Sequence, residues 1–236
     1  KKGWVIGAGR GIGKDVAEVF GREGAHVAVS ARSTGEIQQV AAAIGGDAQA
    51  VPCDVAEPAS VHDAFATVEK SLGRVDILIN SAGISLSAPI HKMPLEDWDR
   101  MMHVNLRGAF LLTQCVLPGM YERGWGPVIH LASIAGKSGM EYVAGYCATK
   151  HGLMGMIRAT ALEVAQKGVT INAVCPGYVD SPMTDGNITR LAKRTGHPEE
   201  AIRGAMEGLS PQKRLFSTSE IAETTLYLAR ESARGI

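Results

Sequence analysis

The sequence of 236 residues has no net charge, no long apolar run and no signal-peptide pattern. Lysine plus arginine and aspartate plus glutamate both number 24, so no excess of basic residues is available to attract nucleic acid. No apolar run approaches the ~18 residues that cross a bilayer, and no secretory leader opens the chain. We therefore expect a cytoplasmic globular protein that binds neither nucleic acid nor a membrane.

Cysteine and histidine patterns that would indicate disulfides or a metal are also missing. Cys53, Cys115, Cys147 and Cys175 lie far apart with no Cys-x-x-Cys pair, as is typical of buried free thiols in a reducing compartment. No two of the seven histidines are four residues apart, so we expect no metal site. Without internal repeats, the length predicts a single domain over residues 1–236.

The first informative segment is a glycine-rich turn between a strand expected at 3–6 and a helix that ends at Gly24. The turn reads Gly7-x-x-x-Gly11-x-Gly13. Such a turn presents unpaired N–H groups and the positive end of a helix, which together bind phosphate. The spacing is not G-x-G-x-x-G, so the position between strand and helix carries the prediction of a dinucleotide site.

The end of the next strand, expected at 26–30, indicates which dinucleotide is bound. Folds that prefer NAD usually place an acid here to bind the ribose 2′-OH, and none is present. Arg32 stands there instead, and with Arg10 it offers two guanidiniums to a 2′-phosphate. We predict NADP(H) rather than NAD(H); the alternative is that both arginines are ordinary solvated side chains.

Strands and helices alternate through the rest of the chain. Further strands are expected at 48–52, 75–79, 128–133 and 169–174, and helices at 33–44, 58–72, 94–121, through Tyr146 to about 166, and at 219–230. This alternation predicts a doubly wound parallel sheet with helices on both faces, a three-layer α/β/α architecture. Ligands bind at the carboxyl ends of such strands, where Asp54, the turn 80–83, Ser133 and the turn after Cys175 are all expected.

Tyr146 and Lys150 are four residues apart in a predicted helix, so they share one face. A free phenol, with a pKa of about 10, is a poor acid or base at neutral pH. A neighbouring ammonium stabilises the phenolate, and the Ser133 hydroxyl is then available to hold a carbonyl or alcohol oxygen. The three residues predict a proton-transfer site for carbonyl/alcohol interconversion.

Residues 182–215 interrupt the alternation with several prolines and glycines. An insertion of this size after a strand end predicts a mobile substrate lid; the alternative is a solvated connector.

In their order and spacing, several of these segments resemble the short-chain dehydrogenase/reductase family. They are Gly7-x-x-x-Gly11-x-Gly13, Asn80-Ser-Ala-Gly83, Asn105, Ser133, Tyr146-x-x-x-Lys150 and Pro176-Gly177. The resemblance implies a Rossmann-type sheet and a catalytic tetrad of Asn105, Ser133, Tyr146 and Lys150. In it the tyrosine transfers the proton, the serine orients the carbonyl, the lysine binds the nicotinamide ribose and lowers the tyrosine pKa, and the asparagine holds a water.

The resemblance also places further residues along the cofactor. With the two arginines, the predicted cofactor-binding residues are Gly7, Arg10, Gly11, Ile12, Gly13, Arg32, Asp54, Val55, Asn80, Ala82, Gly83, Tyr146, Lys150, Pro176, Gly177, Val179 and Ser181. Ile6 stands where the family usually has a threonine that braces the turn 80–83, and the family continues beyond Ile236 into another strand.

The substrate and partners follow from the same resemblance. The chain is most similar to 3-oxoacyl-acyl-carrier-protein reductases and polyketide ketoreductases, which implies reduction of a ketone, such as a 3-oxoacyl thioester, by NADPH. The alternatives are an NAD-linked secondary-alcohol, 3-hydroxybutyrate or polyol dehydrogenase and, outside enzymology, an NADP-sensing regulator. A homodimer or homotetramer is expected, formed through the helix that carries Lys150.

Overall fold

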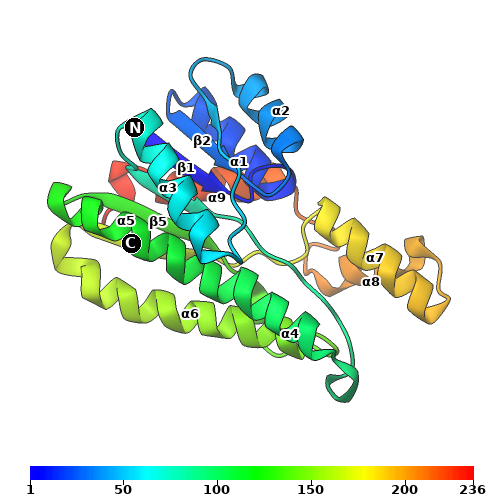
Figure 1. The fold of residues 1–236 in the computed structure, drawn as a ribbon. Helices are drawn as coiled ribbons and strands as arrows, with labels where there is room; N and C mark the ends of the chain where they lie inside the picture. Colours follow the sequence, from blue (N-terminus) through cyan, green and yellow to red (C-terminus); the bar gives the residue numbers. More distant parts are fainter.

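The computed structural model describes residues 1–236, which form a six-stranded sheet with all strands parallel (Figure 1). The strand order is β3-β2-β1-β4-β5-β6. The strands are β1 (Lys2–Ile6), β2 (His26–Ser30), β3 (Gln49–Ala50), β4 (Ile77–Asn80), β5 (Gly126–Leu131) and β6 (Val169–Val174). This order reverses direction between β1 and β4, which is where Rossmann folds bind dinucleotides.

Nine α-helices flank or extend the sheet: α1 (Gly11–Arg22), α2 (Thr34–Ile44), α3 (Pro58–Leu72), α4 (Leu95–Met102), α5 (Gly108–Arg123), α6 (Ala144–Val164), α7 (Pro182–Thr195), α8 (Glu199–Leu209) and α9 (Thr218–Leu228). One apolar core lies between the sheet and helices α3, α5 and α6, and a second lies between the sheet and α1, α2 and α9. The predicted three-layer α/β/α fold is therefore confirmed.

The alternation of side chains along β1 shows how one strand supplies both cores. Trp4 and Ile6 pack into the core under α3, α5 and α6, whereas Val5 packs into the core under α1, α2 and α9. A strand buried on both faces has to be apolar along its buried length, as residues 3–6 of β1 are. The one polar atom of Trp4 is satisfied, because its indole Nε1 donates to Ser30 Oγ at 2.9 Å.

Most elements lie within about two residues of the predicted ranges, and two differ by more. The strand predicted at 48–52 is reduced to Gln49–Ala50, because Pro52 has no N–H to continue the ladder, although Val51 and Cys53 still donate to carbonyls of the β2 segment. The helix predicted at 94–121 is divided into α4, a π-helical turn (His103–Arg107) and α5. Such turns insert an extra residue and occur frequently at functional sites.

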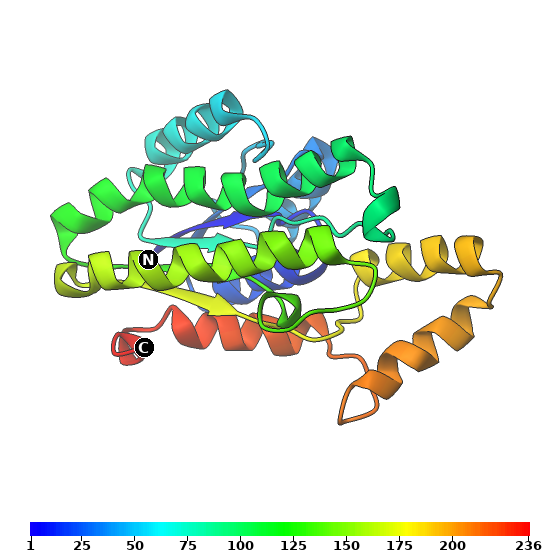
Figure 2. The same cartoon turned by 90° about the horizontal axis from the view of Figure 1, so that it is seen from below.

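The interrupted segment 182–215 is mostly helical. Helices α7 and α8 form a hairpin that projects from one end of the sheet (Figure 2). Arg203 on α8 bonds to Asp180 at 2.9 Å and also pairs with Asp185 on α7, which fixes the hairpin at its base. No helix of the protein combines the length and the hydrophobicity that a membrane span requires.

Candidate active site

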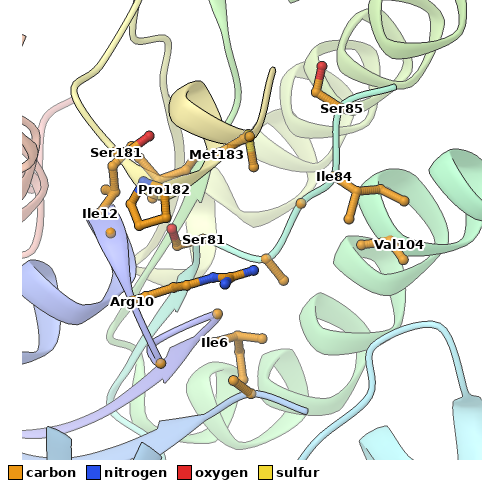
Figure 3. A pocket seen from close by; sticks show the side chains of 18 of the residues that line it. Ile6, Arg10, Ile12, Ser81, Ile84, Ser85, Val104, Ser181, Pro182 and Met183 are labelled. Atoms are coloured by element: carbon orange, nitrogen blue, oxygen red, sulfur yellow. The ribbon is translucent and has the colours of Figure 1, made fainter. Parts of the chain in front are cut away.

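The carboxyl ends of the strands border a cleft of ≈ 800 Å³. Figure 3 shows that Arg10 and Ile12 from the glycine turn face it from one side, and that Ile84 and Val104 border the opposite side. Pro182, at the start of α7, lies beside the glycine turn. The volume is within the range of sites for small molecules and cofactors.

Most of the residues predicted from the sequence line this cleft. They are Gly7, Arg10, Gly11, Ile12, Arg32, Asp54, Val55, Ala82, Gly83, Ser133, Tyr146, Lys150, Pro176, Gly177, Val179 and Ser181. Gly13, Asn80 and Asn105 are not among the lining residues. These three residues would therefore act on a ligand indirectly, by positioning the residues that line the cleft.

The glycine turn has the close backbone packing that a phosphate cradle needs. A Cβ on Gly7 would lie 2.6 Å from Ala82 N, and one on Gly13 would lie 2.2 Å from Gly7 O. Gly11 begins α1 with φ +58°, and the N-cap residue Arg10 makes no side-chain cap hydrogen bond. The first N–H groups of α1 are thus free of a side-chain cap, so the turn fits the phosphates of a dinucleotide.

A carboxylate that the sequence analysis did not identify lies beside the two arginines. Arg10, Arg32 and Ser33 line one end of the cleft together with Glu36 from the first turn of α2. Arg10 Nη1 is 3.9 Å from Glu36 Oε1, and both side chains are substantially exposed. From the sequence, an acidic residue is expected only at the end of β2. Glu36 lies in the first turn of α2, and the start of this helix returns to the same end of the cleft.

Ser133, Tyr146 and Lys150 meet at the other end of the cleft. Ser133 lies two residues beyond β5, and its Oγ accepts a hydrogen bond from Ala135 N at 3.1 Å. Tyr146 and Lys150 lie on the same face of α6, with Lys150 Nζ 5.6 Å from the centre of the Tyr146 ring. The Lys150 ammonium is buried and donates to Leu131 O at 2.8 Å.

Burial moves the pKa values of Lys150 and Tyr146 in opposite directions. It lowers the pKa of Lys150 from 10.5 to about 8, because the charged form loses its hydration. Burial raises the pKa of Tyr146 above 10, while the Ser133 hydroxyl acts to lower it. Lys150 Nζ bonds to a backbone carbonyl beside the Tyr146 ring, and a lowering of the tyrosine pKa by this lysine stays a prediction.

Asn105 joins three segments behind the cleft. Its Oδ1 accepts from Ile84 N at 2.8 Å, and its Nδ2 donates to Ile84 O and to Thr149 Oγ1 at 2.9 and 3.1 Å. Thr149 Oγ1 in turn donates to Tyr146 O. Both amide hydrogens of Asn105 are used, so the side chain fixes the segment after Gly83 to α6 and leaves only Oδ1 to accept from a water. Asn105 lies in the π-helical turn, and from there its side chain reaches Ile84 and Thr149.

Comparison with known proteins agrees with this geometry. The sequence profile of the family described as short chain dehydrogenase matches residues 1–191. D-beta-hydroxybutyrate dehydrogenase of Rhizobium meliloti is 34% identical over 98% of this chain and 92% of its own length. 3-Oxoacyl-acyl-carrier-protein reductase of Escherichia coli is 32% identical over 97% of this chain and 89% of its own.

A crystal structure shares the whole fold. Actinorhodin polyketide ketoreductase, solved with NADPH, superimposes with a TM-score of 0.96 at 33% identity, covering 100% of this chain and 92% of that one. The profile, the relatives and the shared fold lead to one conclusion. The chain belongs to the short-chain dehydrogenase family and is a nicotinamide-dependent oxidoreductase that acts on secondary alcohols or ketones.

Proposed function

We propose that the protein reduces a ketone, with a 3-oxoacyl thioester as the substrate class and NADPH as the reductant. The observation that supports this most directly is the meeting of Ser133, Tyr146 and Lys150 in the same cleft as the glycine turn and its two arginines. Relatives named as 3-oxoacyl reductases and the ketoreductase solved with NADPH favour the same assignment.

In the proposed reaction each of the three side chains has a separate task. When bound, the nicotinamide cofactor supplies the hydride. Ser133 Oγ accepts from Ala135 N, and its single hydrogen, which acts on Tyr146 in the free protein, would be donated to the carbonyl oxygen of the substrate. Tyr146 delivers the proton to that oxygen. Lys150, with a pKa of about 8, is able to return a proton to the tyrosine near neutral pH.

Replacement of the phenol tests the assignment. Tyr146→Phe should lower kcat by at least about 100-fold with NADPH saturating, because a positioned proton donor contributes roughly that much. Tyr142→Phe is the matched control, since Tyr142 precedes the same helix but is exposed and does not line the cleft. Near-wild-type turnover of Tyr146→Phe would refute the assignment.

The preference for NADPH is proposed from Arg10 and Arg32, and Glu36 opposes it. A carboxylate beside Arg10 offsets part of the positive charge that a 2′-phosphate needs. Arg32→Asp should shift relative kcat/KM toward NADH, and Glu36→Gln should shift it toward NADPH. Arg22→Asp, outside the cleft, is the control. Unchanged preference in both cleft variants would refute the 2′-phosphate site.

Glu36 is also the observation that favours a second candidate, an NAD-linked 3-hydroxybutyrate dehydrogenase. A carboxylate at this end of the cleft is the group that binds a ribose 2′-OH, and two relatives are named D-beta-hydroxybutyrate dehydrogenase. Initial rates with acetoacetyl-CoA and carrier-linked 3-oxoacyl groups, compared with free 3-hydroxybutyrate and NAD, separate the two functions.

Helices α7 and α8 are proposed as the substrate lid. Arg190 Nη2 donates to Ser85 O at 3.1 Å and Arg194 Nη1 to Ser87 O at 2.8 Å, so the hairpin rests on the segment that follows β4. Met183 and Arg190 line the cleft from the hairpin. They would meet the acyl chain and the anionic carrier, respectively, of a thioester.

A homo-oligomer is proposed through the outer face of α5 and α6. Gly155 on this face meets no atom within 4 Å of a built Cβ, and Leu162 is 82% exposed. Phe110 on α5 is exposed as well. Leu162→Lys should lower the mass measured by light scattering, whereas Leu209→Lys, exposed on α8, should not. An unchanged mass for Leu162→Lys would place the interface elsewhere.

A further inference from the structure

A fully buried histidine lies directly beneath the turn that follows β4. His130 on β5 is paired in register with Asn80 on β4, and both side chains are buried. Asn80 Nδ2 is 3.3 Å from His130 Nδ1, and His130 Nε2 is 3.1 Å from Thr113 Oγ1 on α5. Thr113 Oγ1 is also 2.8 Å from Ala109 O. The four groups form a continuous chain from the sheet to the helix.

The direction of every hydrogen bond in this chain is determined. Ala109 O can only accept, so the single Thr113 hydroxyl hydrogen points to it. Thr113 Oγ1 must then accept from His130, which places the imidazole hydrogen on Nε2 and leaves Nδ1 as an acceptor. Asn80 Nδ2 donates to that Nδ1.

The other end of the Asn80 amide bonds to a residue that lines the cleft. With Nδ2 turned to His130, Oδ1 accepts from Ala82 N at 3.1 Å. Ala82 lines the cleft, and its backbone N is the atom that a Cβ on Gly7 would approach most closely. If the Asn80 amide were flipped, its NH₂ group would face Ala82 N–H, and two donors would repel each other. The acceptor that His130 offers at Nδ1 therefore sets the orientation of this amide and its bond to the turn.

We propose that His130 is a positioning residue for cofactor binding: as the neutral Nε2–H tautomer it orients Asn80, and Asn80 then fixes the backbone of the turn 81–83. The proposal rests on the cofactor-binding role proposed above for that turn. Asn80 and His130 would thus support the turn 81–83 at a point where Ile6 has no hydroxyl to do so.

The surroundings of His130 support a neutral ring. The side chain has 0% exposure, and the charged group that acts on it is Lys150 on α6. Burial and this cation lower the pKa of His130 from 6.5 to about 3. The ring therefore keeps the acceptor that Asn80 needs throughout the range in which an enzyme is assayed.

Two conservative replacements separate the two ends of the imidazole. In His130→Asn, the amide oxygen takes the place of Nδ1 and can accept from Asn80. In His130→Gln, the longer amide reaches toward Thr113 instead, and in His130→Leu both contacts are lost. Ile129→Val, at the next buried position of β5, is the control for loss of packing alone.

The decisive measurement is the Kd for NADPH and NADH by nucleotide fluorescence, with Tm recorded for each variant. We expect His130→Leu and His130→Gln to bind the preferred nucleotide about tenfold more weakly, the effect of one lost buried hydrogen bond. His130→Asn should stay within about threefold of wild type, and ¹⁵N NMR of wild type should show a protonated Nε2 and an unprotonated Nδ1.

Several outcomes would overturn the proposal. A folded His130→Leu protein with wild-type Kd would do so, as would the opposite tautomer in the NMR spectrum. If His130→Leu does not fold, an affinity for the nucleotide that falls in step with Tm across His130→Asn, His130→Gln and Ile129→Val would show a structural role only. Wild-type protein that binds neither nucleotide would instead refute the function proposed for the turn.

Discussion

Acidification of the protein should reveal His130 through its effect on stability. The folded pKa of this histidine is about 3, below the 6.5 of an unfolded histidine, so the unfolded chain binds an additional proton between these values. A depressed folded pKa contributes stability that is fully present above pH 6.5 and is lost as the pH falls toward 3. The group should therefore make the native state acid-sensitive.

The size of the effect follows from the shift. Between pH 7 and pH 5 the unfolded histidine becomes protonated while the folded one does not, which costs about 2 kcal/mol of unfolding free energy. His130→Asn removes this titration but keeps the acceptor for Asn80. The stability difference between wild type and His130→Asn should therefore change by about 2 kcal/mol in favour of the variant.

Urea unfolding at pH 7 and pH 5, at one protein concentration, measures this difference. Comparison of the two proteins at each pH cancels the titration of the other histidines and of the 24 acidic residues. His62→Asn, at an exposed histidine, is the control and should show no such change. A difference between wild type and His130→Asn that is the same at both pH values would refute the assignment of a buried, neutral imidazole.

Three further predictions concern other parts of the fold. Lys150→Met should abolish activity but raise the unfolding free energy at pH 7 by about 3 kcal/mol, because a buried ammonium with a pKa of about 8 is removed; most of this gain should be lost as the pH approaches 10.5. Gly168→Ala should lower Tm and cost about 2 kcal/mol or more, since φ is +69° and the new Cβ would meet Gly124 O at 2.0 Å. Arg203→Gln should leave Tm nearly unchanged but speed proteolysis of α8, as it releases two exposed ion pairs at the base of the hairpin.

The strand ends were the part of the site that the sequence could predict. The strands are short and most of their residues are apolar, so the residue that follows a strand is placed at the edge of the sheet by the strand itself. Ser133 and Arg32 were predicted in this way, and both line the cleft. The segment 182–215, predicted as a mobile lid or a solvated connector, contains two helices that the sequence does not reveal, because prolines and glycines at helix ends look in sequence like loop residues.

Contacts across the fold could not be predicted in the same way. Glu36 joins the arginine end of the cleft because α2 begins there, and Asn105, within the π-helical turn, bonds to Ile84, which is 21 residues away in the chain. His130 is one of seven histidines in the sequence, and nothing near it in the chain distinguishes it. Its role depends on the pairing of β4 with β5 and on a threonine from α5.

The burial that makes His130 neutral also brings Lys150 toward neutrality, and the two effects depend on each other. A second cation at His130 would act on Lys150 in the same low-dielectric interior and lower the pKa of the lysine further. A neutral imidazole therefore allows Lys150 to keep a pKa of about 8, at which the protonated form still predominates at pH 7. Lys150 can then release its proton near neutral pH, whereas the His130 ring, which would hold the turn 81–83, stays unprotonated there. Replacement of His130 by a permanent cation would disturb both the turn and the acid–base group, which are neighbours: a Cβ on Gly83 would lie 3.8 Å from Lys150 Nζ.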